Sequence, residues 1–205
     1  MIAAAAEVLG RKGFAGLTSR EVAQTAGVKV QLVHYYFRTM GDLTVALARR
    51  IGDEAIKDLA RIAADEEPLQ KMWNIEAQIK ESALAMELVS MATHHEAIRD
   101  EVVRYGEQAR TIQTEAIARY FERNDITPPI PPIAIVFLIG AARQLMLREK
   151  ALGSSLGHRQ VLTVAETWLR RLMSLRTPKA ARSKVRVKPK IKKGASPKRR
   201  KRPKN

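Results

Sequence analysis

The chain has 205 residues, contains no cysteine and carries a formal net charge of +16 at pH 7. A chain of this length buries a core without disulfides, which suits a reducing compartment such as the cytoplasm. Residues 2–6 are too short and too poor in basic residues for a signal peptide. No apolar run approaches the ~20 residues of a membrane span. We therefore expect a cytoplasmic protein without membrane contact.

The first predicted motif is a helix-turn-helix near the N-terminus. Thr18 and Glu21 have the spacing of a capping box, in which each side chain accepts a hydrogen bond from the backbone amide of the other residue. Gly27 supplies the positive φ that a tight turn between helices needs. A second helix is then expected from Lys29 to Phe37. This arrangement is typical of proteins that place the second helix in the major groove of DNA.

The second helix of this motif is predicted to have two unlike faces. Leu32, Val33 and Phe37 are expected to point inward. Lys29 lies at an N-cap position that favours Ser, Thr, Asp or Asn, so we expect a phosphate as its partner. The residues predicted to contact DNA are Thr18, Ser19, Lys29, Val30, Gln31, His34, Tyr35, Tyr36, Arg38 and Thr39.

Thr39 is assigned a double role. With Asp42 it forms a second predicted capping box, and its hydroxyl is also placed for a phosphate. The alternative for the outward face is that Lys29 extends into solvent and that Tyr35 and Tyr36 only cover the domain. Because these residues occur together in one helix-turn-helix motif, DNA binding is favoured over this alternative.

These residues resemble the DNA-binding domain of the tetracycline-repressor (TetR) family of transcriptional regulators. The resemblance covers the N-terminal quarter of the chain and implies a three-helix DNA-binding domain, predicted at residues 1–46, followed by a variable helical domain. The matching residues are Ala5, Ala6, Leu9, Gly13, Phe14, Thr18, Val22, Ala23, Ala26, Gly27, Val28, Val33, Tyr35, Phe37 and Leu43.

The chain departs from the family pattern at four positions of the motif. Lys29 replaces the usual Ser, His34 the usual Tyr, Tyr36 the usual His and Met40 the usual Lys. Met40 removes an expected phosphate contact, so it is not assigned to the site. His34 either donates to DNA, which makes binding pH-sensitive near its reference pKa of ~6.5, or simply substitutes for tyrosine. The chain also opens directly on its first helix, without the basic arm that many relatives have.

The rest of the folded chain is predicted to be helical, which makes the fold class all-α. No segment alternates with period two, and a helical domain for effector binding and dimerisation is predicted at residues 47–176. The Pro-rich stretch at residues 127–132 is expected to separate helices. The predicted helices lie near residues 43–64, 69–94, 95–105, 108–123 and 158–176, and one more is expected to begin at residue 133.

The last two helices are too apolar for the surface of a monomer. Residues 133–139 are continuously apolar, and the helix at 158–176 has apolar residues on nearly two faces. We therefore expect a homodimer with a four-helix interface, an arrangement that the resemblance also implies; a single thick core is the alternative. The predicted interface residues are Ile135, Phe137, Leu138, Leu145, Val161, Val164, Trp168 and Leu172.

The resemblance implies a small-molecule effector bound by the long helix at residues 69–94. Methionines adapt to varied apolar shapes, so an apolar or amphipathic effector is expected, while simple core packing is the alternative. No cofactor, metal site or catalytic motif is identified, and we expect no enzymatic activity. The candidate effector-binding residues are Met72, Trp73, Met86, Met91 and His94.

The C-terminal tail, residues 177–205, is predicted to be disordered. It contains fourteen Lys or Arg, four Pro and no Asp or Glu, so +14 of the net +16 lies there. We favour a DNA-tethering arm over a solubility tail, an RNA contact or a localisation signal.

Two functions follow from these features. The first is a transcriptional repressor, bound to a palindromic operator in double-stranded DNA and released by the effector. The second is an architectural, nucleoid-associated DNA-binding protein in which the tail provides most of the affinity.

Overall fold

The structure, a computed structural model, describes residues 1–73 and 79–174. All regular elements in these ranges are helices, which confirms the predicted all-α fold. The elements in chain order are α1 (Ile2–Lys12), the short 3-10 helix η1 (Phe14–Gly16), α2 (Ser19–Ala26), α3 (Val30–Tyr36), α4 (Met40–Ala63), α5 (Pro68–Trp73), α6 (Ile79–Ala92), α7 (Glu96–Arg123), α8 (Pro132–Ala151) and α9 (His158–Ser174).

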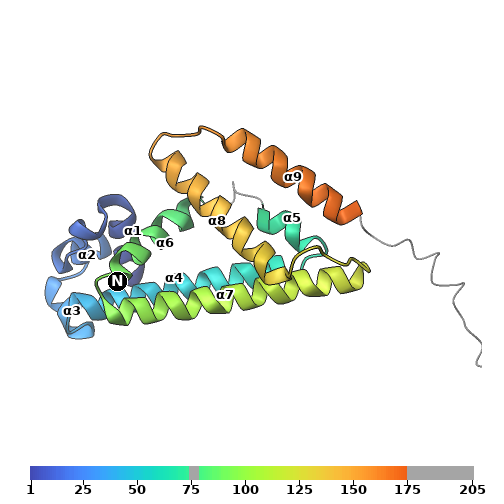
Figure 1. Cartoon of the computed structure of the whole chain (residues 1–205). Helices are drawn as coiled ribbons and strands as arrows, with labels where there is room; N and C mark the ends of the chain where they lie inside the picture. The colour runs from blue at the N-terminus through green and yellow to red at the C-terminus, as the bar shows by residue number, and fades with distance from the viewer. Residues whose placement is uncertain (74–78, 175–205) are drawn as a thin grey trace, which may run out of the picture.

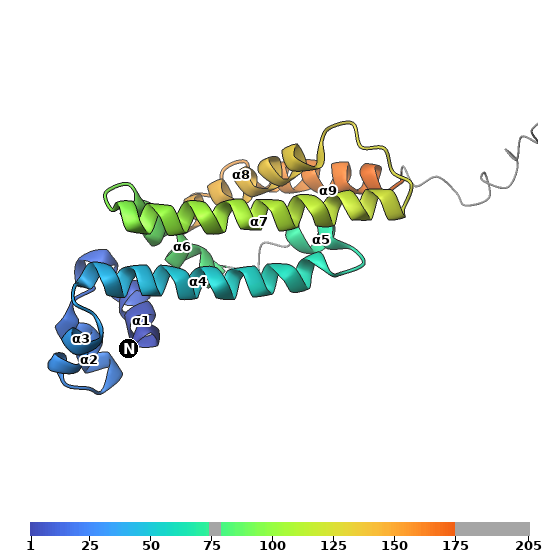
Figure 2. The same ribbon diagram turned by 90° about the horizontal axis from the view of Figure 1, so that it is seen from below.

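Two long helices, α4 and α7, lie side by side and determine the shape of the molecule (Figures 1 and 2). The head, formed by α1, α2 and α3, lies at the N-terminal end of α4, while α8 and α9 lie on the side of α7 that faces away from α4 (Figure 2). The sequence predicted two helices where α7 is continuous, so that prediction was wrong. Gly106 lies inside α7 and does not interrupt it.

The core under the head contains residues from both of the predicted domains. Leu9 from α1, Val22 from α2 and Val33 from α3 are buried there together with Leu47 from α4 and Met91 from α6. Helix α4 also runs without a break through the boundary predicted between residues 46 and 47. The head therefore shares one hydrophobic core with the helices behind it.

A second core lies between α5, α7, α8 and α9. Leu69, Ile117, Ile135 and Leu169 are almost fully buried in it. Helix α8 begins at Pro132, the last residue of the predicted Pro-rich break, because proline is favourable in the first turn of a helix. The α-helices of the described residues thus form two cores, one toward each end of α4 and α7.

A buried carboxylate joins α4 to α7. Glu101 accepts hydrogen bonds from Arg104 Nη2 at 2.6 Å and, across the two helices, from Arg49 Nε at 2.7 Å. These bonds, with Arg104 the larger cause, lower the pKa of Glu101. One turn away, the Tyr105 hydroxyl donates to Asp53 Oδ1 at 2.5 Å. The two helices are therefore fixed to one another by polar contacts.

The packing of α4 against α7 also depends on the absence of a side chain at Gly52. A Cβ atom added to Gly52 would lie 2.3 to 2.5 Å from three ring atoms of Tyr105. Such separations are far inside van der Waals contact, so the ring of Tyr105 occupies the space that any larger residue on α4 would need. Gly52 is therefore a packing requirement of the α4 and α7 pair.

We expect Gly52→Ala to lower the free energy of unfolding by about 1 to 3 kcal/mol, because the steric cost exceeds the gain in helix propensity. The measurement is chemical denaturation of the purified protein. Gly106→Ala is the matched control, since a Cβ there meets only the end of Arg110 at 3.7 Å. Equal stability of the Gly52 variant and the wild type would show that Tyr105 moves away without cost.

Candidate nucleic-acid interface

Helix α2 begins with one half of the predicted capping box. Thr18 is the N-cap, and its hydroxyl oxygen accepts from the Glu21 amide at 3.3 Å. The other half, in which the Glu21 carboxylate accepts from the Thr18 amide, was predicted wrongly, because that amide donates to the Gly16 carbonyl at 2.9 Å. The Glu21 carboxylate instead accepts from Lys12 Nζ at 2.5 Å, and this bond lowers the pKa of Glu21. The start of α2 is thus tied to the end of α1.

The turn between α2 and α3 confirms the predicted role of Gly27. Its φ of 66° and ψ of 31° are left-handed, and the following amide of Val28 bonds back to the Ala23 carbonyl at 3.0 Å. A Cβ at Gly27 would meet nothing within 4 Å, so conformation rather than space requires glycine here. This turn sets the direction of α3 relative to α2.

The inward face of α3 differs from the prediction. Val33 is 1% exposed, and Val30 and Phe37 pack half-buried beside it, whereas Leu32 is 39% exposed. Positions 30, 33 and 37 have the spacing i, i+3, i+7 of one helical stripe, and position 32 lies well away from it. The inward placement of Leu32 was therefore wrong, and Val30, assigned to the DNA face, is largely turned toward the core.

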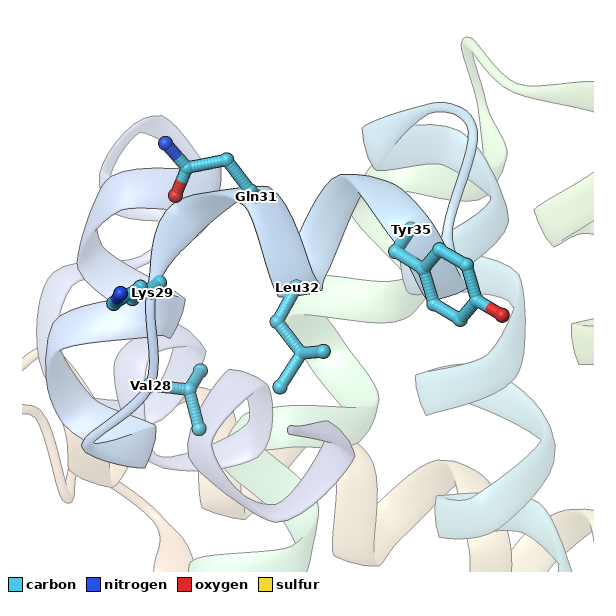
Figure 3. Close-up of a pocket in the computed structure, with 5 residues that line it drawn as sticks. All are labelled: Val28, Lys29, Gln31, Leu32 and Tyr35. Atoms are coloured by element: carbon cyan, nitrogen blue, oxygen red, sulfur yellow. The ribbon is translucent and has the colours of Figure 1, made fainter.

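The outward face of α3 carries the other residues predicted there. Tyr35 and Tyr36 are 80% and 61% exposed, and their rings meet edge to face with centroids 5.2 Å apart. Gln31 and His34 are exposed as well. Lys29 is the exposed N-cap of α3, and its ammonium group, which has no acceptor with which to cap the helix, is available to a partner (Figure 3). One short helix thus presents amide, imidazole, phenol and ammonium groups to solvent.

The second predicted capping box, at the start of α4, is complete. The Thr39 hydroxyl oxygen accepts from the Asp42 amide at 3.1 Å, and Asp42 Oδ2 accepts from the Thr39 amide at 3.0 Å. The hydroxyl hydrogen of Thr39 remains free to donate elsewhere. Thr39 and the neighbouring Arg38 are exposed, as is Thr18 at the start of α2, while Ser19 is half-buried.

An open hollow beside α3 was not foreseen from the sequence. It has a volume of about 510 Å³, and Leu32 belongs to its wall instead of to the core. The i, i+3, i+7 spacing of Val30, Val33 and Phe37 is visible in the sequence and could have predicted that Leu32 lies on the surface. The residues around the hollow are Val28, Lys29, Gln31, Leu32 and Tyr35 (Figure 3).

The predicted dimer residues divide into two groups in the single chain. Ile135 and Leu172 are 0% and 2% exposed, so their assignment to an interface was wrong: both already belong to the second core. Trp168 is half-buried against the same core. The members with large exposed apolar surface are Phe137, Leu138, Leu145, Val161 and Val164.

The five candidate effector residues are not brought together. Met72 and Trp73 are buried in the second core, whereas Met91 is buried in the core under the head. Met86 is half-buried on α6, and His94 is exposed in the turn that follows α6. The sequence predicted one helix for all five, but α5 and α6 pack in different cores on either side of residues 74–78. Their common role as a pocket stays a prediction.

The remaining chemistry of the described residues is sparse. None of their helices combines the length and the apolar character that crossing a bilayer requires. They contain no cluster of three or more His, Asp or Glu side chains suited to a metal ion. The predicted disordered tail lies outside the described residues.

Residues 1–47 match the model of a family described as bacterial regulatory proteins, tetR family. This match assigns the N-terminal part of the chain to that family. The match comprises the head and the first third of α4, the region whose caps, turn and exposed helix are described above.

One TetR-family relative and two solved structures extend this comparison. The HTH-type transcriptional regulator BetI of Rhizobium meliloti is 29% identical over 108 residues, a match that spans 51% of this chain and 53% of BetI. A transcriptional regulator from Saccharomonospora viridis, in complex with choline, superposes with a TM-score of 0.68 at 16% identity, covering 84% of this chain and 93% of that one.

The transcriptional regulator FadR from Bacillus subtilis, in complex with stearoyl-CoA, superposes with a TM-score of 0.62 at 15% identity. Here 84% of this chain and 96% of FadR are covered. At such low identities the two structures establish the fold alone, and they extend the likeness from the head to the helices that follow it.

Proposed function

We propose that this TetR-family protein is a sequence-specific DNA-binding regulator of transcription, acting as a repressor in the cytoplasm on the nucleoid. The observation that carries the proposal is the exposed face of α3. Tyr35 and Tyr36 project into solvent from a helix that Val33 anchors in the core. Exposing two tyrosines has no advantage for the fold itself, whereas an aromatic and polar surface on a short anchored helix suits the major groove.

In this proposal the groups around α3 divide into two classes. Gln31, His34 and Tyr35 contact base edges, because all three are exposed on α3. Lys29 and Arg38 contact phosphates on either side of the groove. The hydroxyls of Thr18 and Thr39 donate to phosphates from the two N-caps while continuing to accept their capping bonds.

The proposed active form is a homodimer. Leu138 and Val164 are 62% and 68% exposed on α8 and α9, which is costly for apolar side chains of a monomer. In this proposal a twofold axis runs through this surface, and the two copies of α3 lie about 34 Å apart, one helical turn of DNA. The corresponding operator is a near-palindrome in double-stranded DNA.

The proposed control is a small apolar or amphipathic effector. The structural neighbours from Saccharomonospora viridis and Bacillus subtilis hold choline and stearoyl-CoA, which supports a ligand site in the helices behind the head. Helix α4 connects the two cores, so a ligand that favours one arrangement of the second core alters the position of the head. The binding and release of DNA are thereby coupled to the ligand.

We expect Tyr35→Ala to weaken operator binding at least tenfold and Lys29→Ala to weaken it severalfold, with the Lys29 variant reducing the salt slope by about two, one phosphate contact in each half-site. Neither change should shift the melting temperature appreciably, since both side chains project into solvent. Fluorescence anisotropy with a duplex selected from a random pool measures the affinity. Lys57→Ala, an exposed lysine on α4, is the control. Unchanged binding by both variants would place the contact surface elsewhere.

We expect Leu138→Lys and Val164→Lys each to convert the dimer into a folded monomer, because each places a charge in the apolar interface. Sedimentation at micromolar concentration measures the association state, and circular dichroism confirms folding. Val89→Lys is the matched control, since Val89 is 53% exposed on α6. A wild-type chain that sediments as a monomer would contradict the proposal.

The charge of residues 177–205 favours a second candidate, an architectural DNA-binding protein. Deleting this tail should lower the affinity for random duplex and the salt slope, because fewer counterions are released on binding. The preference for the selected operator should remain. The measurement is a titration of both duplexes at two salt concentrations. Equal loss of affinity for the two duplexes would favour the architectural function.

A further inference from the structure

The hollow beside α3 combines an apolar wall with polar ends. Val28 and Leu32 lie on the same side of the helix, with Lys29 at one end and Tyr35 at the other, while Gln31 projects from the opposite edge (Figure 3). Val28 is half-buried and packs against the core under the head, so this part of the wall is fixed in place. Leu32 is 39% exposed and covers the rest.

The position of this hollow determines what it meets when α3 enters DNA. It lies on the same short helix as the base-contacting residues of the proposed function, on which this inference therefore rests. Phosphates and sugars line the edges of the major groove, and the base edges within it carry nitrogen and oxygen atoms at nearly every position. The one apolar group that the base edges offer there is the C5-methyl of thymine.

We propose that Leu32, supported by Val28, binds a thymine methyl group and specifies a T·A pair in each operator half-site. Contact with any other base edge would cover the apolar wall with a donor or acceptor that finds no partner there, which is unfavourable. The hollow is open to solvent, so the edge of a base pair with its methyl group can approach the apolar wall. Lys29 and Tyr35 at the two ends keep the base in register by contacts with the DNA around it.

The test removes the methyl group and nothing else. The full chain first selects a duplex from a random pool, and each thymine of one half-site is then replaced by deoxyuridine in turn. At one position we expect the affinity to fall about fourfold, the effect of losing one buried methyl group. Leu32→Ala should bind the thymine duplex more weakly than the wild type binds the uracil duplex, because the variant loses the contact in both half-sites, and it should no longer distinguish the two duplexes.

Two controls separate this contact from a general loss of binding or folding. Val89→Ala, which removes an exposed apolar side chain on α6, should retain the full difference between thymine and uracil. The melting temperature of Leu32→Ala should match that of the wild type, because Leu32 lies outside the core.

The outcomes distinguish this inference from the proposed function. A selected duplex whose affinity is indifferent to every exchange of thymine for uracil overturns the methyl contact while leaving sequence-specific binding intact. A difference that persists in Leu32→Ala overturns the assignment to this residue. A pool from which no sequence is enriched overturns the proposed function and the methyl contact together.

Discussion

Helices α4 and α7 lie against one another because residue 52 has no side chain. The Tyr105 ring fills that space, and the Glu101 carboxylate, held by Arg49 and Arg104, closes the same contact a turn away. Close packing at this point lets the two helices run together between the two cores. Without it the head has no fixed position relative to the second core. Steric fit, more than any single ion pair, therefore sets the geometry of the molecule.

The parts of the site that follow from local chemistry were predictable from the sequence. Gly27 requires only its own φ, and the box of Thr39 and Asp42 involves residues three apart. Such features depend on the nearest few residues, so the tertiary structure leaves them unchanged. The exposure of Tyr35 followed equally from the period of the helix.

The errors arose where distant residues compete with local partners. Glu21 was expected to complete its own capping box, but Lys12 from α1 takes its carboxylate. Leu32 was expected to be buried, although α3 is so short that one stripe, centred on Val33, anchors it. Ile135 was expected at an interface because the sequence of an apolar helix does not show which of its faces packs against other helices of the same chain. These outcomes depend on packing between elements and are not encoded in a local window.

The core beneath the head constrains how this protein can be divided or recombined. Ala48 on α4 and its members on α6 and α7 follow the family-matched segment in the chain, yet they belong to the same core as residues of α1, α2 and α3. An excised N-terminal fragment would expose that apolar underside to water. A chimaera that exchanges operator preference between relatives therefore needs the complementary surfaces of α4, α6 and α7 transplanted along with the recognition elements.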